Sequence, residues 1–185
     1  MKTQTKQTQL ANGLIILSIL ARLLPHPANV TPVGAVSLVG GAKLSRIWKW
    51  TIPFIALLLS DFLLGIFFHL RPWSFVTPFI YASFAINILL GSRVGGSHRY
   101  LKLGALSLVG SLQFFCISNF GVWMEGTLYA KTFAGLAQCY TMAIPFLGNT
   151  MMGDLCWAAG LFTLIEWIQL WIQSPKTESP KTLSA

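Results

Sequence analysis

Long apolar runs recur along the whole chain, and they constrain its fold more than any other feature of the sequence. Of the 185 residues, 54% are hydrophobic and only 10% are charged, whereas a soluble domain usually carries about 25% charged residues. A soluble protein of this length has too much surface to hide so many apolar side chains. Because a bilayer solvates apolar surface, the composition predicts an integral membrane protein with a single domain.

A membrane-spanning helix needs about 20 mostly apolar residues, and shorter helices occur at packed positions. We therefore predict an all-α, polytopic membrane protein with about six transmembrane helices, over residues 10–24, 31–48, 51–69, 75–91, 100–119 and 144–172. These helices form a membrane domain over residues 10–173. A cytoplasmic tail at residues 1–9 precedes it, and a disordered cytoplasmic tail at residues 174–185 follows it. The first apolar run lacks a clean small-x-small cleavage site, so it is interpreted as an uncleaved span.

The distribution of basic residues predicts the orientation of the helices. If the N-terminus is cytoplasmic, ten of the 13 Lys and Arg residues fall on the cytoplasmic side, and only Arg22, Arg71 and Lys131 fall on the other. Because cytoplasmic loops are enriched in Lys and Arg, both termini of this multi-pass protein are expected in the cytoplasm, with the chain in the inner (plasma) membrane. The net charge of +8 then reflects topology and contact with anionic lipid. No nucleic-acid-binding motif is present, so no nucleic-acid partner is expected.

The segment 121–144 is too polar to span a membrane, yet it is rich in aromatic residues. Phe133, Leu136 and Tyr140 share one helical face, whereas Lys131 and Gln138 lie on others. This pattern predicts a short amphipathic helix on the outer surface, or one folded over the bundle as a lid. The alternative is a belt of interfacial aromatic residues without a gating role.

Polar side chains inside a membrane are costly, so each one requires an explanation. The predicted topology groups most of them in the outer half of the bundle, where Arg22 is the only cation near Asp61 and Asp154. An ion pair or triad would offset the cost of burying both signs of charge, and would then fix helix packing. The functional interpretation is a polar pocket open to the outside, in which polar groups orient a ligand and aromatic side chains enclose it. The candidate substrate-binding residues are Arg22, His26, Asn29, Asp61, Asn119, Trp123, Tyr140, Asn149 and Asp154.

Sequence motifs of catalysis are missing from the chain: it has no HExxH, GxSxG, nucleotide-binding lysine loop or dinucleotide GxGxxG. We therefore expect no enzymatic activity and no cofactor. A metal site is not expected either, because His26, Cys116 and Cys139 lack the close spacing of metal ligands. Without an ATPase site, uphill transport would need an ion gradient or a separate subunit. Small residues recur four apart at Ser37 and Gly41, Ser107 and Ser111, and Cys156 and Gly160, a spacing that lets helices approach closely.

Three stretches carry a resemblance: ARLLPHPANVTPVGA at residues 21–35, SNFGVW at 118–123 and GLAQCYTMAIPFLGNTMMGD at 135–154. Together they resemble an uncharacterised family of small bacterial membrane proteins that are described as transport proteins. The layout is also similar to the S components of energy-coupling factor transporters, which bind a vitamin or a metal at the outer face. The second resemblance implies an energising membrane subunit with ATPases as a partner, besides the lipid bilayer.

From these features we expect a membrane transport protein, the substrate-binding subunit for uptake of a small molecule such as a vitamin. A vitamin-sized substrate is favoured over an inorganic ion because aromatic residues outnumber possible metal ligands in the outer half. The alternative is a non-transport membrane scaffold or assembly protein, in which the same polar residues only pair helices. An intramembrane enzyme is a third interpretation, for which no catalytic constellation is visible.

Overall fold

Six α-helices make up the part of the chain that the computed structural model describes, namely residues 2–25, 27, 29–69, 71 and 73–173. The helices are α1 (Lys2–Leu23), α2 (Val33–Lys43), α3 (Trp48–Phe68), α4 (Thr77–Gly91), α5 (Arg99–Glu125) and α6 (Phe133–Gln173). The prediction of an all-α protein is confirmed. The predicted C-terminal tail at residues 174–185 lies outside the described residues.

Three of these helices, α3, α5 and α6, are long and apolar enough to cross a membrane. The apolar parts of the other three, Asn12–Leu23, Val33–Lys43 and Thr77–Gly91, are shorter. At 1.5 Å per residue, the 11-residue α2 spans about 17 Å, whereas the hydrocarbon core of a bilayer is about 30 Å thick. The helices therefore support a membrane protein, and six complete spans stay a prediction.

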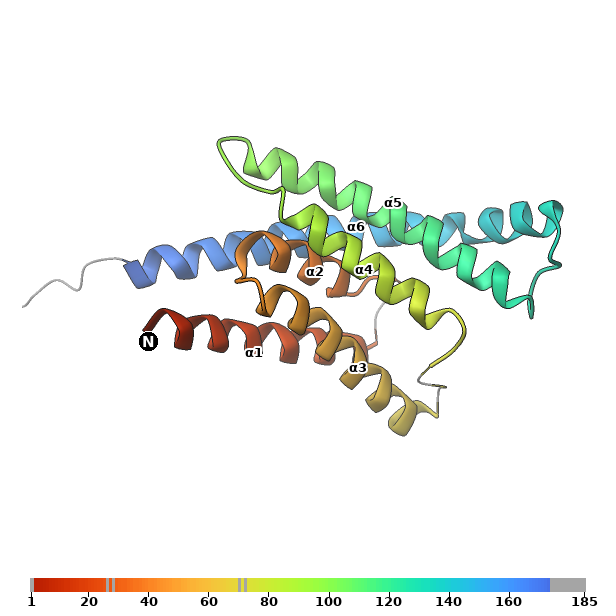
Figure 1. The fold of residues 1–185 in the computed structure, drawn as a ribbon, viewed down its shortest axis with the longest axis horizontal. Helices are drawn as coiled ribbons and strands as arrows, with labels where there is room; N and C mark the ends of the chain where they lie inside the picture. The colour runs from red at the N-terminus through yellow and green to blue at the C-terminus, as the bar shows by residue number, and fades with distance from the viewer. Residues whose placement is uncertain (1, 26, 28, 70, 72, 174–185) are drawn as a thin grey trace, which may run out of the picture.

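The helices run along the long axis of the molecule, with successive connections at alternating ends (Figure 1). The first residues of α1, the α2–α3 and α4–α5 connections and the end of α6 lie at one end. The α1–α2, α3–α4 and α5–α6 connections lie toward the other end, and the α5–α6 connection lies farthest along the molecule. Lys43, Arg46, Lys49, Arg93 and Arg99 all belong to helix ends or connections at the first end. The basic residues that predict the orientation are thus gathered in space as well as in sequence.

Helix α2 forms the centre of the bundle. It packs against α3, α4 and α6, and more lightly against α1 and α5, and every residue from Val33 to Gly41 is buried. Leu38 and Val39 join a core with Ile52 of α3 and Phe162 of α6. The helices α2 and α4 cross at two glycines, Gly41 and Gly91, where no side chain holds the backbones apart. The predicted close approach at Gly41 is confirmed.

Large apolar side chains cover the outside of the bundle. Leu58, Phe62 and Phe67 of α3 are 46%, 52% and 66% exposed, and Leu164 and Trp167 of α6 are 49% and 62% exposed. Soluble monomers rarely expose apolar surface on this scale. This apolar exterior and the length of α3, α5 and α6 agree in indicating a membrane environment.

Helices α5 and α6 form a long hairpin that extends beyond the other helices (Figure 1). The segment 121–144 does not form the separate surface helix expected from its amphipathic pattern. Its first residues end α5 at Glu125, a connection follows, and α6 begins at Phe133. Helix α6 also begins well before the predicted sixth span at residues 144–172, and it continues through Pro145. With 41 residues, α6 is about 60 Å long, about twice the thickness of a hydrocarbon core.

Candidate functional site

A cavity of about 390 Å³ lies between the helices, in the half of the bundle toward the α1–α2 and α3–α4 connections. Its lining combines polar groups with apolar and aromatic walls, as small-molecule sites do. The cavity is lined by Arg22, Asn29, Thr31, Val33, Gly34, Leu57, Leu64, Ile80, Phe84, Asn87, Phe114, Thr150 and Asp154. All six helices and the α1–α2 connection contribute to this lining, so the cavity depends on the tertiary packing of the whole bundle.

The α1–α2 connection brings non-helical backbone to the cavity. Asn29 has a positive φ of 64°, which asparagine tolerates better than most residues, and this turn directs the chain back toward the start of α2. Thr31 follows in the cavity wall, and α2 begins at Val33. Irregular backbone within a membrane bundle is tolerated where it is buried in protein or lines a cavity. The connection thus contributes Asn29 and Thr31 as polar residues of the cavity wall.

Arg22 near the end of α1 forms an ion pair across to α3. One of its guanidinium nitrogens, Nη2, lies 2.7 Å from Oδ1 of Asp61, and both side chains are mostly buried. The other nitrogen, Nη1, donates a hydrogen bond of 2.5 Å to the Ser60 hydroxyl. The predicted pairing of Arg22 with an aspartate is confirmed for Asp61, and this pair joins α1 to α3 beside the cavity.

Asp154 on α6 is the most buried acidic group of the cavity, with a residue exposure of 8%. Its Oδ2 accepts a hydrogen bond of 2.8 Å from the Ser111 hydroxyl of α5. Its Oδ1 lies so close to Gly34 that a Cβ atom there would approach it to 2.3 Å. No ion pair joins Asp154 to a cation among the residues that the structure describes. The predicted triad with Arg22 is therefore not formed.

An amide network closes the cavity between α4 and α5. The Gln113 side chain donates from Nε2 to Oδ1 of Asn87 and to the carbonyl of Ser83, both at 3.0 Å. Asn87 packs directly against Gly110, where a Cβ atom would lie 2.5 Å from its Oδ1. This arrangement fixes the orientation of the Asn87 amide at the cavity wall.

The structure separates the predicted site residues into two groups. Arg22, Asn29 and Asp154 line the cavity. Asp61 does not line it, but it forms an ion pair with Arg22, which does. His26 lies outside the described residues. Asn149 is half-buried on α6 but does not line the cavity, although the next residue does. The remaining three, Asn119, Trp123 and Tyr140, belong to the α5–α6 hairpin and do not line the cavity either.

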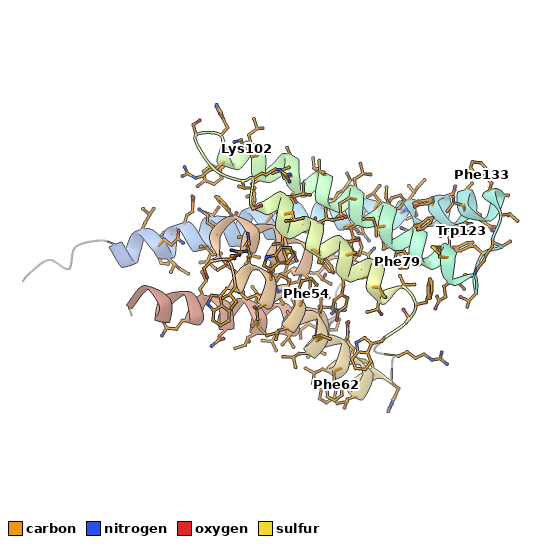
Figure 2. The ribbon with its side chains drawn as sticks, in the orientation of Figure 1. Phe54, Phe62, Phe79, Lys102, Trp123 and Phe133 are labelled. Atoms are coloured by element: carbon orange, nitrogen blue, oxygen red, sulfur yellow. The ribbon has the colours of Figure 1, made fainter. Side chains whose placement is uncertain are left out.

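Local contacts within the hairpin occupy these last side chains. Trp123 donates from Nε1 to the carbonyl of Ala130 at 3.0 Å, and Tyr140 donates to the carbonyl of Cys116 at 2.6 Å. The Asn119 amide donates to the carbonyl of Phe115 one turn earlier. Figure 2 shows Trp123 near the tip of the hairpin with Phe133, at the end of the molecule away from Lys102. A role for this hairpin as a lid stays a prediction.

Sequence reasoning missed Thr31 and Thr150 as cavity residues, and it also missed the aromatic pair Phe84 and Phe114, whose ring centroids lie 5.4 Å apart. A signal existed for Thr150, because it lies four residues before Asp154 and therefore on the same face of a helix. No such signal marks Thr31, whose place depends on how the α1–α2 connection enters the bundle.

A family model matches residues 2–177, nearly the entire chain, and describes a family of unknown function, DUF6580. The chain belongs to the DUF6580 family. No curated protein and no solved structure shows a significant match. The expectation of an uncharacterised family is thus met, and similarity to S components rests on the layout of the sequence alone.

A second polar cluster of this DUF6580 chain lies at the opposite, basic end of the bundle. Glu166 of α6 pairs with Nζ of Lys43 at 2.7 Å and with Nε of Arg99 at 2.9 Å. It also accepts a hydrogen bond from the Tyr100 hydroxyl. Both carboxylate oxygens of Glu166 have partners among the described residues, and the cluster joins α2, α5 and α6. Sequence reasoning missed it, although Glu166 is an acidic residue within the predicted sixth span.

Proposed function

We propose that this protein is the substrate-binding subunit of a transport system that takes up a small molecule such as a vitamin. The observation that carries the proposal is the cavity of about 390 Å³, with an ion pair, a buried carboxylate, two amides and two aromatic rings at its wall. Ligand sites of small molecules commonly have volumes of about 300–1,000 Å³ and a few polar groups in apolar walls. The cavity fits one vitamin-sized molecule.

Orientation supports uptake rather than export in this proposal. The cavity lies in the half of the bundle away from the cluster of basic connections, and the positive-inside rule assigns those connections to the cytoplasm. The cavity then belongs to the outer half of a protein in the bacterial inner membrane, with both termini inside. An energising membrane subunit with ATPases is the partner that we propose, by similarity to S components.

One observation favours the second candidate, a membrane scaffold or assembly protein. The Arg22–Asp61 pair and the Ser111–Asp154 hydrogen bond both join neighbouring helices, as purely structural polar contacts would. A scaffold, however, gains nothing from a cavity of this size between its helices, because side chains that line a cavity lose packing contacts. The cavity therefore favours binding over scaffolding.

A cavity-filling substitution tests the proposal. Leu64→Trp places a larger side chain into the cavity from α3, and Leu59→Trp places the same side chain on the exposed face of that helix. Both variants would be purified in detergent and screened with the wild type against water-soluble vitamins, with thermal stabilisation as the readout, because a ligand that binds the native state raises its melting temperature.

We expect at least one compound to stabilise the wild type and Leu59→Trp but not Leu64→Trp, and cells expressing Leu64→Trp to lose uptake of that compound. Equal uptake and equal stabilisation in all three proteins would remove the cavity as the binding site. It would leave the scaffold as the better interpretation.

A further inference from the structure

The charges around the cavity do not balance. Arg22 is engaged by Asp61 at 2.7 Å and by Ser60 at 2.5 Å. Among the residues that the structure describes, Asp154 has no cationic partner, and the one side chain that donates a hydrogen bond to it is the neutral Ser111 hydroxyl. The described side chains of the site thus carry one uncompensated negative charge when Asp154 is ionised. Buried charges in proteins are normally paired, because an unpaired one is costly.

We propose that the ligand of the cavity is a small organic cation whose positive charge lies against Asp154. This inference rests on the proposed binding function and specifies its substrate class. The ligand supplies the missing counter-charge, so the carboxylate is paired only in the complex. A charge-assisted hydrogen bond to an ammonium group is about twice as strong as one between neutral groups.

The wall around Asp154 suits a cation with an apolar body. Phe84 and Phe114 pack together with ring centroids 5.4 Å apart and both line the cavity, and aromatic faces attract cations within about 6 Å. The Thr150 hydroxyl donates its proton to the carbonyl of Phe146, so its oxygen can still accept a hydrogen bond. Leu57 and Leu64 complete an apolar surface for the rest of the ligand.

The start of α2 offers an alternative counter-charge, but an insufficient one. Gly34 lies in the first turn of α2, against Oδ1 of Asp154. The N-terminus of a helix carries about half a positive elementary charge, so it offsets only part of a full carboxylate charge. Gly34 also permits this contact, because any larger residue there would collide with the carboxylate. The carboxylate is thus held at the cavity wall with part of its charge still to be neutralised.

The test compares three ligands with one ring system and different charge: tryptamine as the cation, indole-3-acetamide as the neutral form and indole-3-acetate as the anion. Each is titrated into the purified full-length protein in detergent while the melting temperature is measured. A saturating ligand at about 100 times its Kd raises the melting temperature of a protein of this size by about 5–10 °C. We expect this rise for tryptamine, and no more than a small one for the other two compounds.

Two variants assign the preference to a residue. Asp154→Asn keeps the shape of the side chain and its contact with Ser111 but removes the charge, and we expect the Kd of tryptamine to rise at least about tenfold. Glu125→Gln removes one negative charge at the end of α5, outside the cavity lining, and we expect it to bind tryptamine like the wild type. The comparison of the three ligands on the wild type does not depend on how Asp154→Asn folds.

The outcomes separate the two proposals. Equal or stronger stabilisation by indole-3-acetamide or indole-3-acetate overturns the cationic ligand, as does an unchanged tryptamine Kd in Asp154→Asn. In either case, if a ligand binds the wild type but not Leu64→Trp, the cavity is still supported as a binding site. Loss of tryptamine binding in Asp154→Asn, with full binding in Glu125→Gln, supports the assignment of Asp154 as the residue that selects the charge.

Discussion

Replacing Gly41 by alanine tests the close contact between α2 and α4, two helices that both line the cavity. A Cβ atom at Gly41 would lie 2.2 Å from the carbonyl oxygen of Ile88 and 3.1 Å from the Cα atom of Gly91. Ordinary van der Waals contact begins at 3.4 Å, so the two helices would have to separate by about 1.2 Å at this point. Because the obstacle is backbone rather than a side chain, no change of rotamer relieves it.

The expected loss of stability follows from two opposing terms. Overpacking a core costs about 1–3 kcal/mol, and the backbone collision puts Gly41→Ala toward the upper end of that range. Against this, alanine stabilises a helix by about 0.5–1 kcal/mol relative to glycine. The net free energy of unfolding should fall by about 1–2.5 kcal/mol, which lowers the melting temperature of a chain of this size by about 2–10 °C.

The assay is thermal unfolding of the purified protein in detergent, followed by circular dichroism. Gly160→Ala is the matched control, because a Cβ atom at Gly160 of α6 would meet no atom within 4 Å. It should melt at the wild-type temperature or slightly above. If Gly41→Ala and Gly160→Ala melt at the same temperature, α2 and α4 do not approach each other closely at Gly41.

Three further predictions concern the polar contacts and the topology. Glu166→Gln should reduce the free energy of unfolding by about 1–3 kcal/mol, measured by the same thermal assay, because it leaves two nearby cations without their anion. A double-mutant cycle of Arg22→Gln and Asp61→Asn should give a coupling free energy of about 1–2 kcal/mol; a value near zero would contradict the ion pair. In a cysteine-free background, a membrane-impermeant maleimide added to intact cells should label Leu128→Cys but not Ser97→Cys, and the reverse pattern would invert the proposed orientation.

The sequence predicts a helix well where that helix has a long apolar run, as a helix exposed to lipid requires. The predicted spans at residues 51–69, 75–91 and 100–119 begin within a few residues of α3, α4 and α5, because their apolar runs are long and end in polar or proline-rich segments. Helix α2 is different, because its length is set by burial among other helices rather than by the bilayer. The span predicted from hydropathy, residues 31–48, is therefore longer than the helix. The predicted spans at residues 100–119 and 144–172 are also too short at the end of α5 and at the start of α6. They were limited to the thickness of a membrane, whereas both helices of the hairpin continue beyond that length.

The candidate site could be predicted in part, since charge in an apolar run is conspicuous. Arg22 and Asp154 were found for that reason, and both line the cavity. The aromatic residues assigned to enclose a ligand, Trp123 and Tyr140, were chosen by their outer position and lie in the hairpin instead. The spacing of small residues predicted the buried pair of Ser107 and Ser111, yet the same spacing at Cys156 and Gly160 faces outward, because spacing identifies a face but not the helix that covers it.

The burial of α2 on all sides has a consequence for how the chain is assembled. A segment of 11 residues is too short to be inserted as a stable span by its own partition into lipid. The neighbours that cover its nine buried residues are mainly α3, α4 and α6, all of which follow it in the sequence. During synthesis the main packing partners of α2 are therefore made after α2 itself. Its packing in the bundle is complete only after α6 has been made. The second helix to leave the ribosome therefore completes its packing only when the last one has been made, and a chain truncated before α6 leaves α2 without one of its three main neighbours.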